Sequence, residues 1–200
     1  LADVERLNGL YQTTLDSNLV TTFHERATIS GPEEVTLASG KTVSAKVILI
    51  ATGGWPVLPA IPGAEHGITS NEAFHLKELP RRVVIAGGGY IANEFAGIFH
   101  ALGSAVTIVN RSDQILRGYD EEIRNRLLEI SKAKGIAFRF NAPFEKIEKS
   151  ADGSLLAHFS DDGAPIACDA VMFAIGRTPK IDGLGLESIG VAQSDAGAII

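Results

Sequence analysis

The sequence has 200 residues, of which 45% are hydrophobic and 21% are charged, with a formal net charge of -6 at pH 7. This is the composition of a globular protein that is long enough for one large or two small cores. The acidic balance argues against a nucleic-acid partner, which needs a basic surface. No apolar run approaches the ~18 residues of a membrane-spanning helix, so we expect no membrane partner either.

The two chain ends suggest a part of a larger protein, and the single cysteine indicates a reducing environment. Leu1 falls in what reads as the middle of a helix and Ile200 inside an apolar run, so we expect both ends to lie within a larger protein. Cys168 is the only cysteine, which excludes an internal disulfide framework and a thiolate metal cluster and suits a reducing, cytoplasmic setting. It precedes an apolar run and has no C-x-x-C partner. We interpret it as structural, and we predict no metal site.

The first 50 residues predict a helix followed by short strands. Apolar side chains recur at helical spacing within residues 1–15, at Val4, Leu7, Leu10 and Tyr11. Strands are predicted at 19–23, 27–30, 34–37 and 42–50. Residues 46–51, at the end of the last of these strands, are nearly all apolar, which is typical of a strand buried on both faces. The three prolines of residues 55–63 indicate a linker.

From residue 68 onward, strand and helix patterns alternate. The predicted strands lie at 83–86, 105–109, 136–140, 146–149, 155–160 and 170–174. A helix over 90–102 would bury Ile91, Phe95, Ile98 and Leu102, and one from 119 to Gly135 would bury Ile123, Leu127 and Ile130. This order predicts an α/β fold with a Rossmann-like, doubly wound parallel sheet. Hairpin signals at Asp152-Gly153 and Asp162-Gly163 predict an added antiparallel meander.

A glycine motif stands where the first of these strands meets its helix. The residues Gly87-Gly88-Gly89-Tyr90-Ile91-Ala92 fit the pattern G-x-G-x-x-A. In a dinucleotide site, Gly87 would allow the tight turn, Gly89 would let the backbone approach a pyrophosphate, and Ala92 would let the helix pack closely. The pyrophosphate would then sit on the free N–H groups of the helix N-terminus. Glycine triplets also serve ordinary loops, but the strand-to-helix context favours a dinucleotide.

The end of the next strand bears on which dinucleotide is bound. NAD sites usually have an acidic residue there, which accepts hydrogen bonds from the ribose. This chain has Asn110, followed by Arg111 and then Arg117. Guanidinium groups attract a 2′-phosphate and can bind it bidentately, so the pattern favours NADP(H). Exposed arginines are also ordinary solubilising residues, and Asp113 could pair with either one.

Four motifs in order carry a resemblance to a known family. They are Ala51-Thr52-Gly53-Gly54, the glycine run extended through Asn93-Glu94-Phe95-Ala96-Gly97, Arg111 with Leu116-Arg117, and Ala174-Ile175-Gly176-Arg177-Thr178-Pro179. Together they resemble the FAD-dependent pyridine nucleotide–disulfide oxidoreductases, and among these the glutathione reductases. The similarity covers essentially the whole chain. The motifs are highly specific to the superfamily and less specific to the glutathione enzymes.

The resemblance implies a domain division. Residues 1–50 would be part of an FAD-binding domain, 51–176 the NADPH-binding Rossmann domain, and 177–200 the return into the FAD-binding domain. The family's FAD glycine loop, redox cysteine pair and C-terminal histidine–glutamate base would lie outside these 200 residues. We therefore expect no catalytic residue of disulfide reduction here and no activity from the chain alone. The parent protein would be a homodimer.

The resemblance also implies roles for single residues. Tyr90 would be the gate that swings from the flavin when nicotinamide stacks there, and Glu94 would lie beside flavin and nicotinamide. The other NADPH contacts would come from the glycine motif, including Gly88 and Ile91, and from Arg111, Arg117 and Gly176, whereas Ala27 and Thr52 would contact FAD. Without a ligand, Tyr90 could simply cap the helix, and Glu94 could be an exposed acid favoured by the helix dipole.

The implied parent reaction passes hydride from NADPH to FAD, then electrons to a cysteine pair and on to glutathione disulfide. Trypanothione, mercuric and dihydrolipoamide-type enzymes are alternatives, although the last usually has an acid in place of Asn110. Asn93, where the family usually has an apolar residue, and Lys180, where asparagine is commoner, leave the substrate open. A non-catalytic NADPH-binding module is the alternative from a different class.

Overall fold

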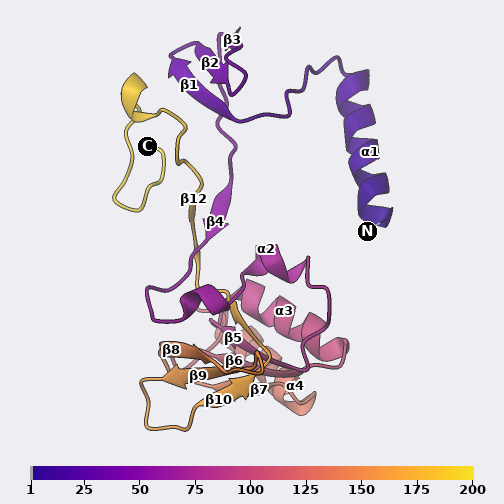
Figure 1. Cartoon of the computed structure of the whole chain (residues 1–200), viewed down its shortest axis with the longest axis vertical. Helices are drawn as coiled ribbons and strands as arrows, with labels where there is room; N and C mark the ends of the chain where they lie inside the picture. The colour runs from indigo at the N-terminus through magenta and orange to yellow at the C-terminus, as the bar shows by residue number, and fades with distance from the viewer. Residues whose placement is uncertain (1) are drawn as a thin grey trace. The chain divides into compact units, whose positions relative to one another are not determined.

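The computed structural model describes residues 2–200, which divide into two compact units (Figure 1). One unit contains residues 2–52 and 181–200, and the other contains residues 53–180. Among the described residues, no helix has both the length and the apolar character needed to cross a membrane.

The first unit contains a helix and a small antiparallel sheet. Helix α1 spans Ala2–Ser17, and strands β1 (Ala27–Gly31), β2 (Glu34–Leu37) and β3 (Thr42–Ser44) pair in the order β1-β2-β3. A short 3-10 helix, η2, spans Glu187–Ile189. Ile29, Leu184 and Leu186 form a small buried cluster, against which Ile48 and Ile50 pack. Residues from both ends of the chain therefore build this core.

Two predictions for this unit are wrong. Residues 19–23 form no strand, because the chain turns at Leu19 with φ +57° as α1 ends. The strand predicted over 42–50 stops at Ser44, and Val47 and Leu49 are 83% and 87% exposed. This segment packs on the small cluster through Ile48 and Ile50 only, and no described strand pairs with residues 46–51. On α1, the side chains of Val4, Leu7, Leu10 and Tyr11 are likewise exposed, and none of the helix residues is buried.

The second unit is built around a parallel sheet with the order β11-β5-β6-β7. Its strands are β5 (Arg82–Ala86), β6 (Ala105–Val109), β7 (Ala137–Arg139) and β11 (Ala170–Phe173). Helix α3 (Tyr90–Ala101) connects β5 to β6, and α4 (Glu121–Ala133) connects β6 to β7. Strands β8 (Phe144–Lys149), β9 (Leu155–Phe159) and β10 (Ile166–Cys168) form an antiparallel meander. The predicted Rossmann-like sheet with an added meander is confirmed.

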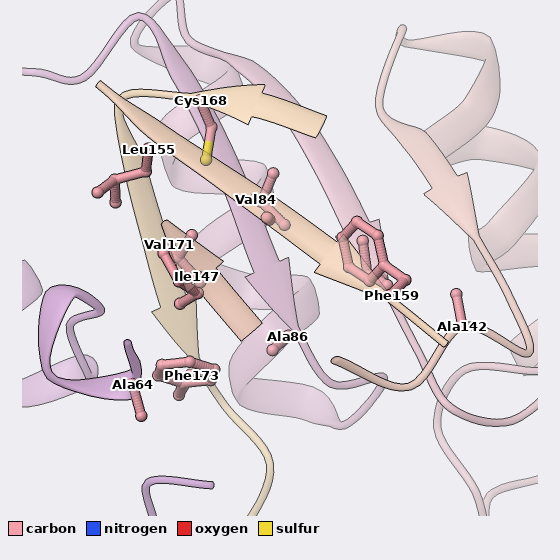
Figure 2. Close-up of a cluster of buried hydrophobic side chains, with 12 residues drawn as sticks. Ala64, Val84, Ala86, Ala142, Ile147, Leu155, Phe159, Cys168, Val171 and Phe173 are labelled. Carbon is pink, nitrogen blue, oxygen red and sulfur yellow. The ribbon is translucent and has the colours of Figure 1, made fainter. Parts of the chain in front are cut away.

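Side chains of β5 alternate between two cores, as the two-residue period of a strand requires. Val83 and Ile85 pack with α3, whereas Val84 and Ala86 pack with the meander. Figure 2 shows the second core, a single cluster that contains Cys168 and Phe173 together with side chains of β8 and β9. Both faces of the central strands are thus covered, which explains their almost continuous apolar sequence. Full burial of a valine, isoleucine or phenylalanine side chain in these cores stabilises the fold by about 1.5–3 kcal/mol.

The buried faces of the two crossover helices differ from those predicted. Helix α3 buries Ala92, Phe95, Ala96 and Phe99. Ile98 and Leu102 are 48% and 62% exposed, because the small side chains of the two alanines let the helix approach the sheet on a neighbouring face. In α4, Ile123 is 62% exposed and Ile130 is 38% exposed, so this helix buries less than its spacing predicted. Gly103 ends α3 with φ +105°, the conformation expected of a C′ glycine.

The remaining elements of this unit lie near its boundaries. Strand β4 (Gly54–Pro56) pairs antiparallel with β12 (Arg177–Pro179). This ribbon keeps residues 177–180 in the second unit, although the sequence placed a boundary after residue 176. A 3-10 helix, η1 (Ala64–His66), and helix α2 (Ser70–Ala73) precede β5. The assignment of each unit to a cofactor stays a prediction.

Candidate nucleotide-binding site

A cleft of about 880 Å³ lies at the carboxyl ends of the parallel strands. Its walls include residues 86–89 at the end of β5, 109–112 at the end of β6, 142–144 beyond β7 and 173–176 at the end of β11. The chain runs outward from β5 through β6 to β7 and then returns to β11 on the other side of β5. This reversal is a topological switch point, where open α/β sheets bind their ligands. The volume suits a large organic ligand.

A side chain would have a different effect at each of the three glycine positions of the turn. Gly87 has φ +118°, and a Cβ there would overlap the carbonyl oxygen of Ala174, so the fold itself requires glycine. A Cβ on Gly88 would lie 2.5 Å from Nδ2 of Asn110. Gly89 has φ -75°, which any residue adopts, and its Cβ would meet no atom within 4 Å. The fold therefore leaves space at Gly89 on the wall of the cleft.

The N-terminus of α3 faces this space without a side-chain cap. Gly89 is its N-cap residue and its first turn carries no acidic residue. In the same unit, α2 is capped by Thr69 and α4 by Asp120, each of which accepts a hydrogen bond from the backbone of its helix. Because backbone N–H groups at a helix start need acceptors, an uncapped start beside a cleft can bind an anion.

Two cationic side chains lie on the wall that follows β6. Arg111 and Arg117 both line the cleft and are exposed. Within residues 2–200, neither arginine takes part in an ion pair, nor does Asp113, which the sequence left as a competing partner. The cleft therefore combines an uncapped helix start with two guanidinium groups. That charge distribution suits a ligand with two separate anionic groups.

The loop of residues 111–117, here called the arginine loop, is anchored at its far end. Ile115 and Leu116 are 1% and 7% exposed, and Leu116 has φ +51°. The backbone N–H of Leu116 donates to the carbonyl oxygen of Gly88 at 2.7 Å, and that of Tyr119 donates to the carbonyl of Leu116 at 3.0 Å. The arginine loop is therefore tied directly to the glycine turn.

The structure brings most of the predicted nucleotide residues together. Gly87, Gly88, Gly89, Tyr90, Ile91, Arg111, Arg117 and Gly176 all line the cleft. Ala92 does not, since it is fully buried between α3 and the sheet. Glu94 is exposed on α3 and is not part of the wall. Ala27 and Thr52 belong to the other unit.

Sequence reasoning missed several wall residues. Val57, Pro59, Ser112, Gln114 and Tyr119 contribute to the cleft, as do residues 142–144 after β7. The residues after β7 and β11 could have been found from topology, because carboxyl ends of parallel strands share one edge. Val57 and Pro59 lie in the segment taken as a linker and carried no such signal.

Cys168 and the metal-ligating residue types do not belong to this site. Cys168 is fully buried in the core that the parallel sheet shares with the meander, and burial raises the pKa of its thiol to about 11. Between residues 2 and 200, no group of three or more His, Cys, Asp or Glu side chains is arranged to hold a metal ion.

The parallel sheet, the glycine turn and the cleft define an α/β dinucleotide-binding fold. The chain belongs to the pyridine nucleotide-disulphide oxidoreductase family, whose family model matches residues 2–200. Its structure is similar to that of the HOCl-induced flavoprotein disulfide reductase RclA from Escherichia coli, with a TM-score of 0.85 and 28% identity. That match covers 98% of this chain and 47% of the other.

Curated relatives give the same family. The chain is 44% identical over 198 residues to a glutathione reductase of Burkholderia cepacia, covering 99% of this chain and 43% of the relative. It is 42% identical to a glutathione reductase of Nostoc, covering 97% of this chain and 42% of that protein. A trypanothione reductase of Trypanosoma congolense is 47% identical over 160 residues, covering 78% of this chain and 32% of the relative. The chain thus spans less than half the length of these relatives.

Proposed function

We propose that this chain is the NADPH-binding portion of a flavin-dependent disulfide reductase whose parent enzyme reduces glutathione disulfide. The proposal rests on one observation: the same cleft contains an uncapped helix start at Gly89 and the side chains of Arg111 and Arg117. Among the described residues, neither arginine forms an ion pair. NADPH carries two such separate anionic groups, a pyrophosphate and a 2′-phosphate.

The residues present fit this cofactor. The N-terminus of α3 would hold the pyrophosphate, and the absent side chain of Gly89 leaves room for its approach. Arg111 and Arg117 would bind the 2′-phosphate by charge-assisted hydrogen bonds. NADPH, when bound, supplies a hydride for transfer to a flavin, and the protein supplies orientation and electrostatics.

The further roles follow the family resemblance. Tyr90, which is 53% exposed at the start of α3, would cover the nicotinamide position, and Glu94 one turn later would lie near the flavin. Ile91 and Gly176 would add NADPH contacts from the cleft wall. Ala27 and Thr52 would contact FAD in the complete enzyme, which would be a cytoplasmic homodimer.

Glutathione disulfide is the proposed substrate because relatives named as glutathione reductases match nearly the whole chain. Trypanothione disulfide is the second candidate, supported by the 47% identity to a trypanothione reductase over a shorter stretch. Steady-state assays of the full-length parent with NADPH and either disulfide separate the two. Faster turnover with glutathione disulfide supports the proposal, and turnover with trypanothione disulfide alone contradicts it.

The cofactor assignment is tested on the chain itself. Titration calorimetry with NADPH and NADH should give a much lower Kd for NADPH, because each charge-assisted bond to a phosphate contributes about 1.5–3 kcal/mol. Equal affinity for the two would refute the role of the two arginines. Tight binding of NADPH by a full-length parent that reduces no disulfide would instead support a non-catalytic module.

A further inference from the structure

Asn110 directly follows β6, and its backbone is held by two hydrogen bonds. Its N–H donates to the carbonyl of Arg139 at 2.9 Å, and its own carbonyl accepts from the N–H of Ala142 at 3.1 Å. Both partners belong to β7 or the residues just after it. The side chain of Asn110 therefore leaves the sheet from a rigid point at the entrance to the arginine loop.

The side-chain amide of Asn110 spans the arginine loop. Its Nδ2 donates to Oγ of Ser112 at 2.8 Å and to the backbone carbonyl of Gln114 at 2.7 Å. An amide nitrogen has two hydrogens, so this geometry uses its full donor capacity within the loop. The loop is thereby drawn back toward the strand end between its two arginines.

The same amide lies against the glycine turn. The position that a Cβ of Gly88 would occupy is only 2.5 Å from Nδ2 of Asn110, so the amide fits there because residue 88 has no side chain. The carbonyl of Gly88 in turn accepts the 2.7 Å hydrogen bond from Leu116 at the far end of the loop. Asn110 and Leu116 thus attach the arginine loop to the turn at two separate points.

From this geometry we infer that Asn110 is a positioning residue for cofactor specificity: its amide holds the arginine loop against the glycine turn, so that Arg111 and Arg117 face the 2′-phosphate of the bound dinucleotide. The inference rests on the proposed function and deepens it. Asn110 acts through the arginines and needs no contact with the phosphate. In NAD sites, by contrast, the residue at this strand end accepts hydrogen bonds from the ribose itself.

The chemistry of the position restricts what can replace asparagine. Leucine has nearly the same shape but no donor, so Asn110→Leu removes both loop hydrogen bonds without adding charge. In Asn110→Asp, a carboxylate oxygen would face the carbonyl oxygen of Gln114 and would also repel a 2′-phosphate. Asn125 lies exposed on α4 outside the cleft, so Asn125→Asp makes the same charge change as a matched control.

The test is a double-mutant cycle on the full chain, with 2′,5′-ADP and 5′-AMP as probes because they differ only in the 2′-phosphate. Asn110→Leu should reduce the preference for 2′,5′-ADP at least about fivefold, since one charge-assisted bond corresponds to roughly tenfold or more in affinity. In the background of Arg111→Ala with Arg117→Ala, it should cause no further loss of preference. Asn110→Asp should also lower the preference, whereas its control Asn125→Asp, with the same charge change outside the cleft, should leave the preference unchanged.

The outcomes separate the two proposals. Suppose that the unsubstituted chain prefers 2′,5′-ADP. If Asn110→Leu then weakens binding of both probes equally, or lowers the preference equally with and without the two arginines, Asn110 is merely structural and the inference is overturned. If the unsubstituted chain shows no preference for 2′,5′-ADP over 5′-AMP, the proposed function fails, and the inference fails with it. Should Asn110→Leu not fold, Ser112→Ala serves instead, because it removes one acceptor of the amide and should give a smaller loss in the same direction.

Discussion

The backbone N–H of Leu116 donates to the carbonyl oxygen of Gly88 at 2.7 Å, so the arginine loop and the glycine turn are hydrogen-bonded to each other. Asn93, on the first turn of α3, also donates its side-chain amide to the carbonyls of Gly88 and Gly89, at 3.1 and 2.8 Å. The turn is therefore held from the loop and from the helix. A nucleotide that rests on the turn would meet the arginines at a fixed separation.

Replacing both Arg111 and Arg117 with alanine should abolish the preference for NADPH over NADH and leave the fold intact. The two side chains are exposed and the described residues show no ion pair for either, so truncation creates no cavity and leaves no partner charge alone. Calorimetry with both cofactors checks the affinity, and thermal melting checks the fold. If the double variant still preferred NADPH, the 2′-phosphate would have to bind outside this loop.

Ala92→Leu should lower the free energy of unfolding by about 1–3 kcal/mol through overpacking. Ala92 is fully buried where α3 meets the sheet, so a larger side chain must push the two apart. Denaturant unfolding measures the change. Ile98→Leu on the same helix is the matched control, because Ile98 is 48% exposed and should tolerate the change. Equal stability of the Ala92→Leu variant would contradict the close packing described here.

Asp161→Asn should destabilise the fold at neutral pH and progressively less in acid. Hydrogen bonds from the Arg139 guanidinium lower the pKa of Asp161 below its ordinary value. In the unfolded chain the pKa of an aspartate is about 3.9, and in the folded protein the pKa of Asp161 is lower. The ion pair therefore stabilises the fold fully at pH values above the unfolded pKa. This stabilisation is lost as the pH falls through the pKa of the folded state. Urea unfolding of both proteins at neutral and acidic pH measures the difference. A difference that grew on acidification would contradict the ion pair.

Cys168 should resist alkylation in the folded protein. It is fully buried, and its thiol pKa of about 11 leaves little of the reactive thiolate at neutral or mildly basic pH. We expect iodoacetamide to label it slowly in buffer and rapidly in guanidinium chloride, as followed by intact mass. Rapid labelling of the folded protein would argue against its structural role.

The sequence predicted those elements best that carry strong local signals. The strand at 105–109, the helix start at Tyr90 and the hairpins at Asp152-Gly153 and Asp162-Gly163 are all found. The strand predicted over 42–50 is found only as far as Ser44, because the apolar pattern of its second half cannot tell whether another strand pairs with it. The roles of Tyr90, Glu94, Ala27 and Thr52 came from the family resemblance and stay predictions.

In the candidate site, too, the sequence predicted residues with strong local signals and missed those that depend on tertiary contacts. Motif spacing predicted the glycine turn and both arginines, because these residues are close in sequence and chemically distinctive. It did not predict that Asn110 bonds to Ser112 and Gln114, since either a free or an engaged amide is compatible with that position. Likewise, wall residues such as Val57 have no distinctive chemistry and reach the cleft only through the fold.

The central claim is that the dinucleotide lies on the Gly87–Gly89 turn, and binding of NADPH by Gly89→Val tests it most directly. A side chain at Gly89 meets no protein atom within 4 Å at its Cβ and needs no unusual backbone conformation, so the variant should melt close to the parent. Gly87→Val is the contrast, because its φ of +118° and the nearby Ala174 carbonyl should cost roughly 1–3 kcal/mol in stability. We predict that folded Gly89→Val shows no calorimetric binding of NADPH. Binding at the affinity of the parent chain would contradict the account.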